Sequence, residues 1–157
     1  MNKSTARTKQ AGFTLVELVT VTAIVGILTG LAVPAYNQWI ARFQLKQAVA
    51  DIQSQLTHAR WIAMNRNATV RVALATVSGK VQLNVTDVTG TQQLVPPSTM
   101  MGTINGVAGG PVQFSSMGML ANGTSALIQV SNTKSQTYSV WVNAGGKATW
   151  CPKSTCP

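Results

Sequence analysis

Acidic residues and histidine are scarce in this chain of 157 residues. It contains three acids, Glu17, Asp51 and Asp87, and a single histidine. Enzymes that use paired carboxylates or a Ser-His-Asp set need more of these groups than the sequence supplies. The glycine pairs lie at expected turns and lack the strand–loop–helix setting of a phosphate-binding loop. We therefore expect neither enzymatic activity nor a bound cofactor.

Cysteine is equally scarce. The only two, Cys151 and Cys156, lie within the last seven residues. A metal site would need more ligands, and His58 is far away in the sequence. A local disulfide is the better interpretation, and it predicts an oxidising compartment such as the periplasm or the cell surface. Closing so small a loop stabilises the fold by about 2 kcal/mol at most, so its expected role is to stiffen the C-terminal tail.

Basic residues, in contrast, are abundant: twelve Lys and Arg give a formal net charge of +9. Such a surplus favours polyanionic partners, either nucleic acid such as double-stranded DNA or anionic lipid headgroups. Basic proteins without nucleic-acid function are also common. Composition alone therefore leaves DNA binding open.

Charge is almost missing from residues 13–36, where Glu17 is the only acid or base. At 1.5 Å per residue, a helix of this length spans about 36 Å, enough to cross a hydrocarbon core of about 30 Å. The segment is therefore predicted to be a transmembrane helix in the inner membrane. Basic residues before it predict a cytoplasmic N-terminus and a periplasmic domain formed by residues 37–157.

A small residue, Gly12, comes before this apolar segment, whereas a secretory signal places its cleavage site after the segment. Cleavage after Gly12 would remove residues 1–12 as a leader and keep the apolar helix. A carboxylate such as Glu17 inside a membrane costs about 2.5–3.5 kcal/mol, which points to a function. Cleavage would create a partner, the α-amine of Phe13, one turn away. The alternative is an interfacial Glu17 that favours the helix dipole.

The heptapeptide of residues 12–18, Gly-Phe-Thr-Leu-Val-Glu-Leu, resembles the prepilin peptidase recognition motif of type IV pilins and type II secretion pseudopilins. The resemblance implies cleavage between Gly12 and Phe13 and N-methylation of Phe13. It also implies that Glu17 pairs with the N-terminal amine of an adjacent subunit. Pro34 falls where pilin helices usually carry a proline, and we expect it to kink or locally open the helix.

Beyond Pro34 the helical pattern continues to about residues 65–67. Apolar residues recur there at spacings of three and four, at Leu45, Val49, Ile52, Leu56, Ala59 and Ala63. Such a stripe is typical of a helix that packs on a sheet, and a coiled-coil seam is the weaker alternative over so few turns.

The apolar period then changes to two. Alternation predicts strands at residues 70–74 and 81–85 around a Ser78-Gly79 turn. Later strands are expected at residues 112–115, 126–131, 136–143 and 147–151, the last two joined by a turn at residues 144–146. The prolines and glycines of residues 96–111 predict a long irregular connection. One long helix followed by antiparallel strands makes an α+β domain.

This layout resembles the GspH/FimT family of minor pilins and pseudopilins. The cues are the extended helix, the hairpin after it, and residues 114–118, Phe-Ser-Ser-Met-Gly, which look like that family's Phe and Gly positions. The resemblance implies the pilin fold and a minor pilin of a type IV pilus, with other pilin subunits and the prepilin peptidase as partners. The alternative is a GspH-like minor pseudopilin of a type II secretion system.

Some FimT-type pilins bind DNA for natural transformation through a Gly-Arg-x-Arg pattern near the C-terminus. The matching residues 146–149, Gly-Lys-Ala-Thr, keep a base at Lys147 but have Thr149 at the second basic position. The resemblance is therefore incomplete at the position that would distinguish a DNA-binding chain.

Lys147, Trp150 and Lys153 can still form a small basic surface with a stacking aromatic ring. Arg66 and Arg71 extend this surface if the fold brings them near. In the alternative, Trp150 packs on the domain and the lysines only solvate the tail.

Overall fold

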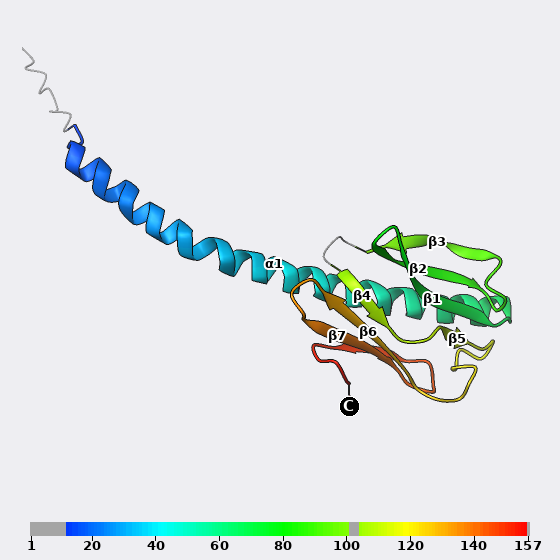
Figure 1. Cartoon of the computed structure of the whole chain (residues 1–157). Coiled ribbons are helices and arrows are strands. Elements are labelled where there is room, and N and C mark those ends of the chain that lie inside the picture. Colours follow the sequence, from blue (N-terminus) through cyan, green and yellow to red (C-terminus); the bar gives the residue numbers. More distant parts are fainter. Residues whose placement is uncertain (1–11, 101–103, 157) are drawn as a thin grey trace, which may run out of the picture. The chain divides into compact units, whose positions relative to one another are not determined.

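The computed structural model describes residues 12–100 and 104–156, without the side chains of residues 32–35. One helix, α1 (Leu15–Arg66), is followed by eight strands (Figure 1). The strands are β1 (Val70–Val77), β2 (Lys80–Asp87), β3 (Gln93–Thr99), β4 (Ile104–Ala108), β5 (Val112–Phe114), β6 (Ala126–Asn132), β7 (Thr137–Val142) and β8 (Ala148–Cys151). Contacts divide the chain into two units, residues 1–37 and residues 38–157.

In the first unit, α1 begins directly after Thr14. The Thr14 hydroxyl oxygen accepts a hydrogen bond from the backbone N–H of Glu17 at 3.2 Å, which is the bond of an N-cap residue. The pair matches the Thr-x-x-Glu spacing of a capping box, so the start of the helix is encoded locally. The kink predicted at Pro34 falls on residues 32–35, whose side chains lie outside the described part of the structure.

The apolar side chains of this first part of α1 are exposed all round the helix, from Leu15 to Leu31. Its most apolar window has a mean hydropathy of 2.1 and no buried residue. By length and composition the helix can cross a membrane. An apolar surface of this extent is unstable in water, so the segment requires a membrane or other apolar partners.

In the second unit, the predicted stripe on α1 is confirmed: Leu45, Val49, Ile52, Leu56, Ala59 and Ala63 are all fully buried. α1 ends at Arg66, inside the predicted range. Asn67 has a positive φ of 48°, and the N–H of Ala68 donates to the carbonyl of Ala63 at 3.2 Å. These are the features of a Schellman-type C-cap, in which Asn tolerates the left-handed conformation.

The strands form two antiparallel sheets. Sheet A has the order β3-β2-β1-β5 and sheet B the order β4-β6-β7-β8. Figure 1 shows both beside the C-terminal part of α1. Alternate residues of each sheet face α1, such as Val70 and Val72 on β1 or Val140 and Val142 on β7, and they join the helix stripe in one core.

The β1–β2 hairpin is confirmed, with Ser78 and Gly79 at φ values of 51° and 74°. Two positive φ values in a two-residue loop match the twist of the flanking strands. The strands predicted at residues 112–115, 126–131, 136–143 and 147–151 correspond to β5, β6, β7 and β8.

The irregular connection predicted for residues 96–111 is wrong, because two strands lie across this region. β3 contains Pro96 and Pro97, and β4 contains Gly106. Both are edge strands, where a missing N–H breaks no ladder on the outer side. Their pairing is also irregular, with register shifts opposite Asn84 on β2 and between Ile104 and Gly106 on β4. Proline and glycine thus mark edges and bulges here.

Burial of the helix stripe predicts that substitutions at buried and at exposed positions of α1 differ in their effect on the stability of the fold. Leu56→Ala should lower the free energy of unfolding by about 2–5 kcal/mol, because it leaves a cavity in the core. The matched control is Met64→Ala on the same helix, whose side chain is 42% exposed. Urea unfolding of the full chain in maltoside detergent measures both, and equal destabilisation of the two variants would contradict the described core.

Candidate functional site

The N-terminal site consists of Gly12, Phe13 and Glu17. Gly12 and Phe13 lie outside the helix, just before α1, and are exposed. A peptide bond in an exposed non-helical segment is accessible to a peptidase. The predicted cleavage site therefore lies in a segment that needs no unfolding to be reached.

Glu17 lies in the first turn of α1 and is also exposed. Residues 12–37 contain no Lys, Arg or His, so no side chain of this segment can neutralise its carboxylate. A carboxylate at a helix N-terminus interacts favourably with the helix dipole, which agrees with the alternative considered above. Such an interaction contributes about 0.3–1 kcal/mol at an exposed position, less than the cost of about 2.5–3.5 kcal/mol for a carboxylate inside a membrane.

Trp150 lies on β8 with its ring on the face of sheet B that packs towards the core. The ring stacks on Tyr138 with centroids 6.0 Å apart and planes 6° apart. The Lys46 ammonium lies over the ring, 5.9 Å from its centroid. Trp150 thus packs on the domain, as in the alternative considered above, and its inner face is not open for base stacking.

Lys147 is exposed in the β7–β8 turn, whose backbone is held by Asn143. The Lys147 N–H donates to Asn143 Oδ1 at 2.8 Å, and the Asn143 N–H donates to the Lys147 carbonyl at 3.0 Å. The turn at residues 144–146 is therefore confirmed. Its fixed backbone holds the Lys147 side chain out into solvent.

Cys151 and Cys156 form a disulfide with an S–S distance of 2.04 Å, as predicted. The closed loop folds over the outer face of sheet B. The Ser139 hydroxyl donates to the Lys153 carbonyl at 2.7 Å, and Gln129 Nε2 donates to the Ser154 carbonyl at 2.6 Å. The loop thereby buries Ser139, which no sequence pattern predicts, and it keeps the exposed Lys153 side chain beside the sheet.

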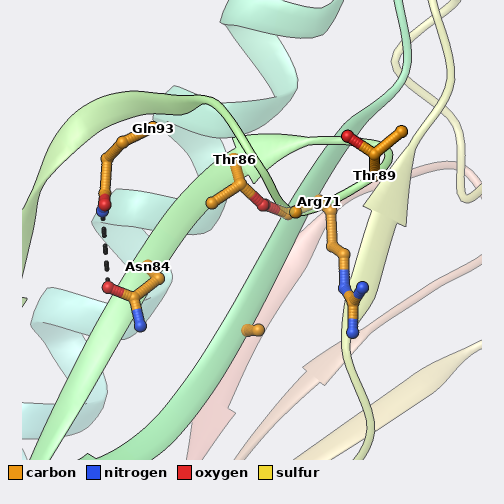
Figure 2. A pocket seen from close by; sticks show the side chains of 7 residues that line it. Arg71, Asn84, Thr86, Thr89 and Gln93 are labelled. Carbon is orange, nitrogen blue, oxygen red and sulfur yellow. Dashed lines mark hydrogen bonds between the residues drawn. The ribbon is translucent and has the colours of Figure 1, made fainter.

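Arg66 and Arg71 lie in other elements than Lys147, Trp150 and Lys153: Arg66 is the last residue of α1, and Arg71 is on β1 of sheet A. Arg71 is on the outer face of sheet A, where it lines a hollow of about 400 Å³ with Asn84, Thr86 and Gln93 (Figure 2). Arg66, at the end of α1, lines a second hollow beside β3. The two arginines are thus grouped with sheet A, and the expectation that they extend the C-terminal surface gains no support.

The fold instead brings Lys46 and Arg60 of α1 to β8. Arg60 lies against Gly118 and Gly146, and its Nε is buried without a hydrogen-bond partner among the described residues. Between these two bases, Gln53 Nε2 donates to the Ala148 carbonyl at 3.2 Å. Sequence reasoning assigned neither base to this surface, because both lie on the polar flank of the helix, where periodicity does not distinguish a solvent contact from a contact with a strand.

The one carboxylate in the strand region is held by its own turn. Asp87, at the end of β2, accepts hydrogen bonds from the Thr89 hydroxyl at 2.5 Å and from the Gln92 and Thr91 amides at 3.0 and 2.9 Å. These bonds, that of Thr89 first, lower the pKa of the carboxyl below its usual range. Asp87 therefore stabilises the β2–β3 turn and lies away from β8.

Comparison with known proteins agrees with the site and the fold. Residues 7–33 match the family described as "Prokaryotic N-terminal methylation motif". The match covers Gly12, Phe13 and Glu17. In overall structure the chain is similar to the type IV minor pilin FimU of Pseudomonas aeruginosa. The TM-score is 0.59 at 16% sequence identity, over 74% of this chain and 94% of that structure.

The chain is thus similar to type IV pilins in its N-terminal motif and in its fold. It is 40% identical over 81 residues to the type IV major pilin protein PilE1 of Neisseria gonorrhoeae, covering 46% of this chain and 49% of the relative. It is 36% identical over 102 residues to a fimbrial protein of P. aeruginosa, covering 55% and 66%. The pilin-like chain spans about half the length of the first curated relatives it matches.

The β7–β8 turn of this pilin-like protein depends on glycine at one position. Gly146 has a φ of 79°, and a Cβ there would meet the Gly118 carbonyl oxygen, whereas a Cβ on Gly145 would make only an ordinary 3.5 Å contact. Gly146→Ala should therefore destabilise the fold by more than about 1 kcal/mol, and Gly145→Ala by clearly less. Thermal unfolding of the two variants compares them, and equal stability would contradict the described packing of Gly118 on Gly146.

Proposed function

We propose that this chain is a minor pilin that is inserted in the inner membrane, processed after Gly12 and assembled into a type IV pilus. The observation that carries the proposal is the coincidence of a glycine just before the helix, a carboxylate in the first helical turn and an apolar helix exposed on all sides. Residues 37–157 form the periplasmic domain in this proposal. A minor pseudopilin of a type II secretion system is the second form of the same role.

The apolar part of α1 needs one cover before assembly and another after it. In the membrane the cover is lipid, which suits the exposed side chains between Leu15 and Leu31. In a filament the cover is a bundle of the same helices from neighbouring subunits. Transfer between two apolar environments exposes little apolar surface to water, so extraction from the membrane costs little free energy for these side chains.

Glu17 provides the directional contact in this transfer. Cleavage by the prepilin peptidase would leave a positively charged amine on Phe13, four residues before the carboxylate. In a low-dielectric helix bundle, an unpaired carboxylate is strongly disfavoured and a paired one is tolerated. The pairing of Glu17 with the Phe13 amine of a neighbouring subunit therefore fixes how far one helix sits along the next.

Glu17→Gln should abolish or strongly reduce entry into filaments, because the amide cannot neutralise the neighbour's amine. The matched control is Thr20→Val, one turn further on, where the hydroxyl donates to carbonyls of its own helix, those of Val16 and Glu17. Immunoblots of sheared filaments and of membranes measure how each variant divides between the two. Normal incorporation of the Glu17→Gln chain would contradict the pairing.

A second candidate function, binding of double-stranded DNA, has one observation in its favour. Four bases, Lys46, Arg60, Lys147 and Lys153, lie on or beside β8, and none of them is ion-paired among the described residues. The two acids outside the apolar segment do not lie at this surface: Asp87 is on sheet A, and Asp51 is on α1. Asp51 is two residues from Gln53, which at about 100° per residue puts it on another face of α1.

DNA binding predicts a specific dependence on salt and on two lysines. Lys147→Gln with Lys153→Gln should weaken binding and reduce the slope of log K against log salt by about one for each phosphate that the variant no longer neutralises. The matched control is Lys80→Gln at the start of β2, which is also exposed but lies on sheet A. Fluorescence anisotropy of labelled DNA with the full chain in maltoside detergent measures both. Equal effects of the lysine pair and the control would exclude β8 as the binding surface.

A further inference from the structure

One face of α1, just beyond the apolar segment, combines aromatic and basic side chains. Trp39, Arg42, Phe43 and Lys46 follow the spacing i, i+3, i+4, i+7, which places all four on one side of the helix. All four are exposed. The opposite side of the same turns is buried through Ala41, Leu45 and Ala48. These four residues are called the collar face below.

The aromatic half of the collar face is unusual for a domain surface in water. Trp39 is 61% exposed and Phe43 is 49% exposed, and their rings stack with centroids 5.7 Å apart and planes 14° apart. Two large neighbouring aromatic rings left in solvent indicate a surface that meets another phase or partner. Trp and other amphipathic rings concentrate at the boundary between hydrocarbon and water.

The basic half has no acid to balance it along the helix. No Asp or Glu occurs between Glu17 and Asp51, whereas Arg42 and Lys46 fall in that interval. The Lys46 ammonium lies over the Trp150 ring, a contact that leaves its positive charge in place. The collar face therefore carries two net positive charges within one turn of two aromatic rings.

Chain length limits how far these charges lie from the membrane. Arg42 follows Tyr36, the last residue of the apolar segment, by six positions, which is at most about 9 Å of helix. The polar zone of each leaflet is about 5–7 Å thick. Helical side chains lean towards the N-terminus, and a long basic side chain reaches several ångströms further, so Arg42 reaches the phosphate level. Lys46, a turn later, reaches it less well.

We propose that the collar face docks on anionic phospholipid headgroups, with the Trp39 ring towards the hydrocarbon boundary and Arg42 on the lipid phosphate. The proposal rests on the membrane insertion contained in the proposed function. Its occupant follows from the continuity of the chain with the apolar segment and from the uncompensated positive charge. Docking holds the domain at the membrane surface, so that Glu17 and the apolar helix are presented to an assembling filament at a fixed depth.

The test uses the full chain reconstituted in phosphatidylcholine vesicles that contain phosphatidylglycerol. Bromine atoms, which quench Trp fluorescence, are placed near the headgroup of one lipid or the other at equal mole fraction. We expect brominated phosphatidylglycerol to quench more than brominated phosphatidylcholine. The excess should be lost in Trp39→Phe and kept in Trp61→Phe, a matched control because Trp61 is on the same helix and 60% exposed.

The charge requirement has its own matched pair. Arg42→Gln should remove the excess quenching by phosphatidylglycerol, Lys46→Gln should reduce it less, and Arg66→Gln, exposed at the far end of α1, should keep it. Equal quenching by the two lipids in the unmodified chain, or an excess that survives Arg42→Gln, would overturn the proposal. A chain that leaves the vesicles in an alkaline wash would instead contradict membrane insertion and with it the proposed function.

Discussion

Burial of one stripe of α1 against two sheets is the interaction on which the rest of the structure depends. The stripe from Leu45 to Ala63 supplies the helix side of the core, and the inner faces of sheets A and B supply the other. The same helix begins with side chains that are apolar on every side and have no protein cover. Because both parts belong to one continuous helix, α1, a folded domain is joined to a segment that is stable only in lipid or among other helices.

The sequence predicted this division well, because both parts of α1 carry strong periodic or compositional signals. The stripe, the capped end near Arg66 and the β1–β2 hairpin follow from local patterns that the core reinforces. β3 and β4 were missed because prolines and glycines, which end a central strand, are accepted at a sheet edge that pairs irregularly. The disulfide followed from the cysteine spacing, whereas its packing over Ser139 depends on the register of β7 with β8.

The candidate site was predictable only in its N-terminal part. Gly12, Phe13 and Glu17 lie within six consecutive residues, so their pattern can be read from the sequence without the fold. The match to the N-terminal methylation motif covers all three. The surface around β8 is assembled from residues about 100 positions apart. The sequence allowed Arg66 and Arg71 to extend this surface if the fold brought them near, whereas the fold brings Lys46 and Arg60. Net charge indicates a class of partner, and only tertiary structure decides which bases share a face.

In the proposed function, the mature chain loses its basic leader, keeps the whole of α1 and is exported to an oxidising compartment. Intact-mass spectrometry of the protein purified from native membranes, without reducing agent, tests all three parts together. The expected mass is that of residues 13–157 with one added methyl group and, because of the Cys151–Cys156 bond, with two hydrogens fewer than the reduced form. A mass that includes residues 1–12, or a chain cut after the apolar segment, would contradict it.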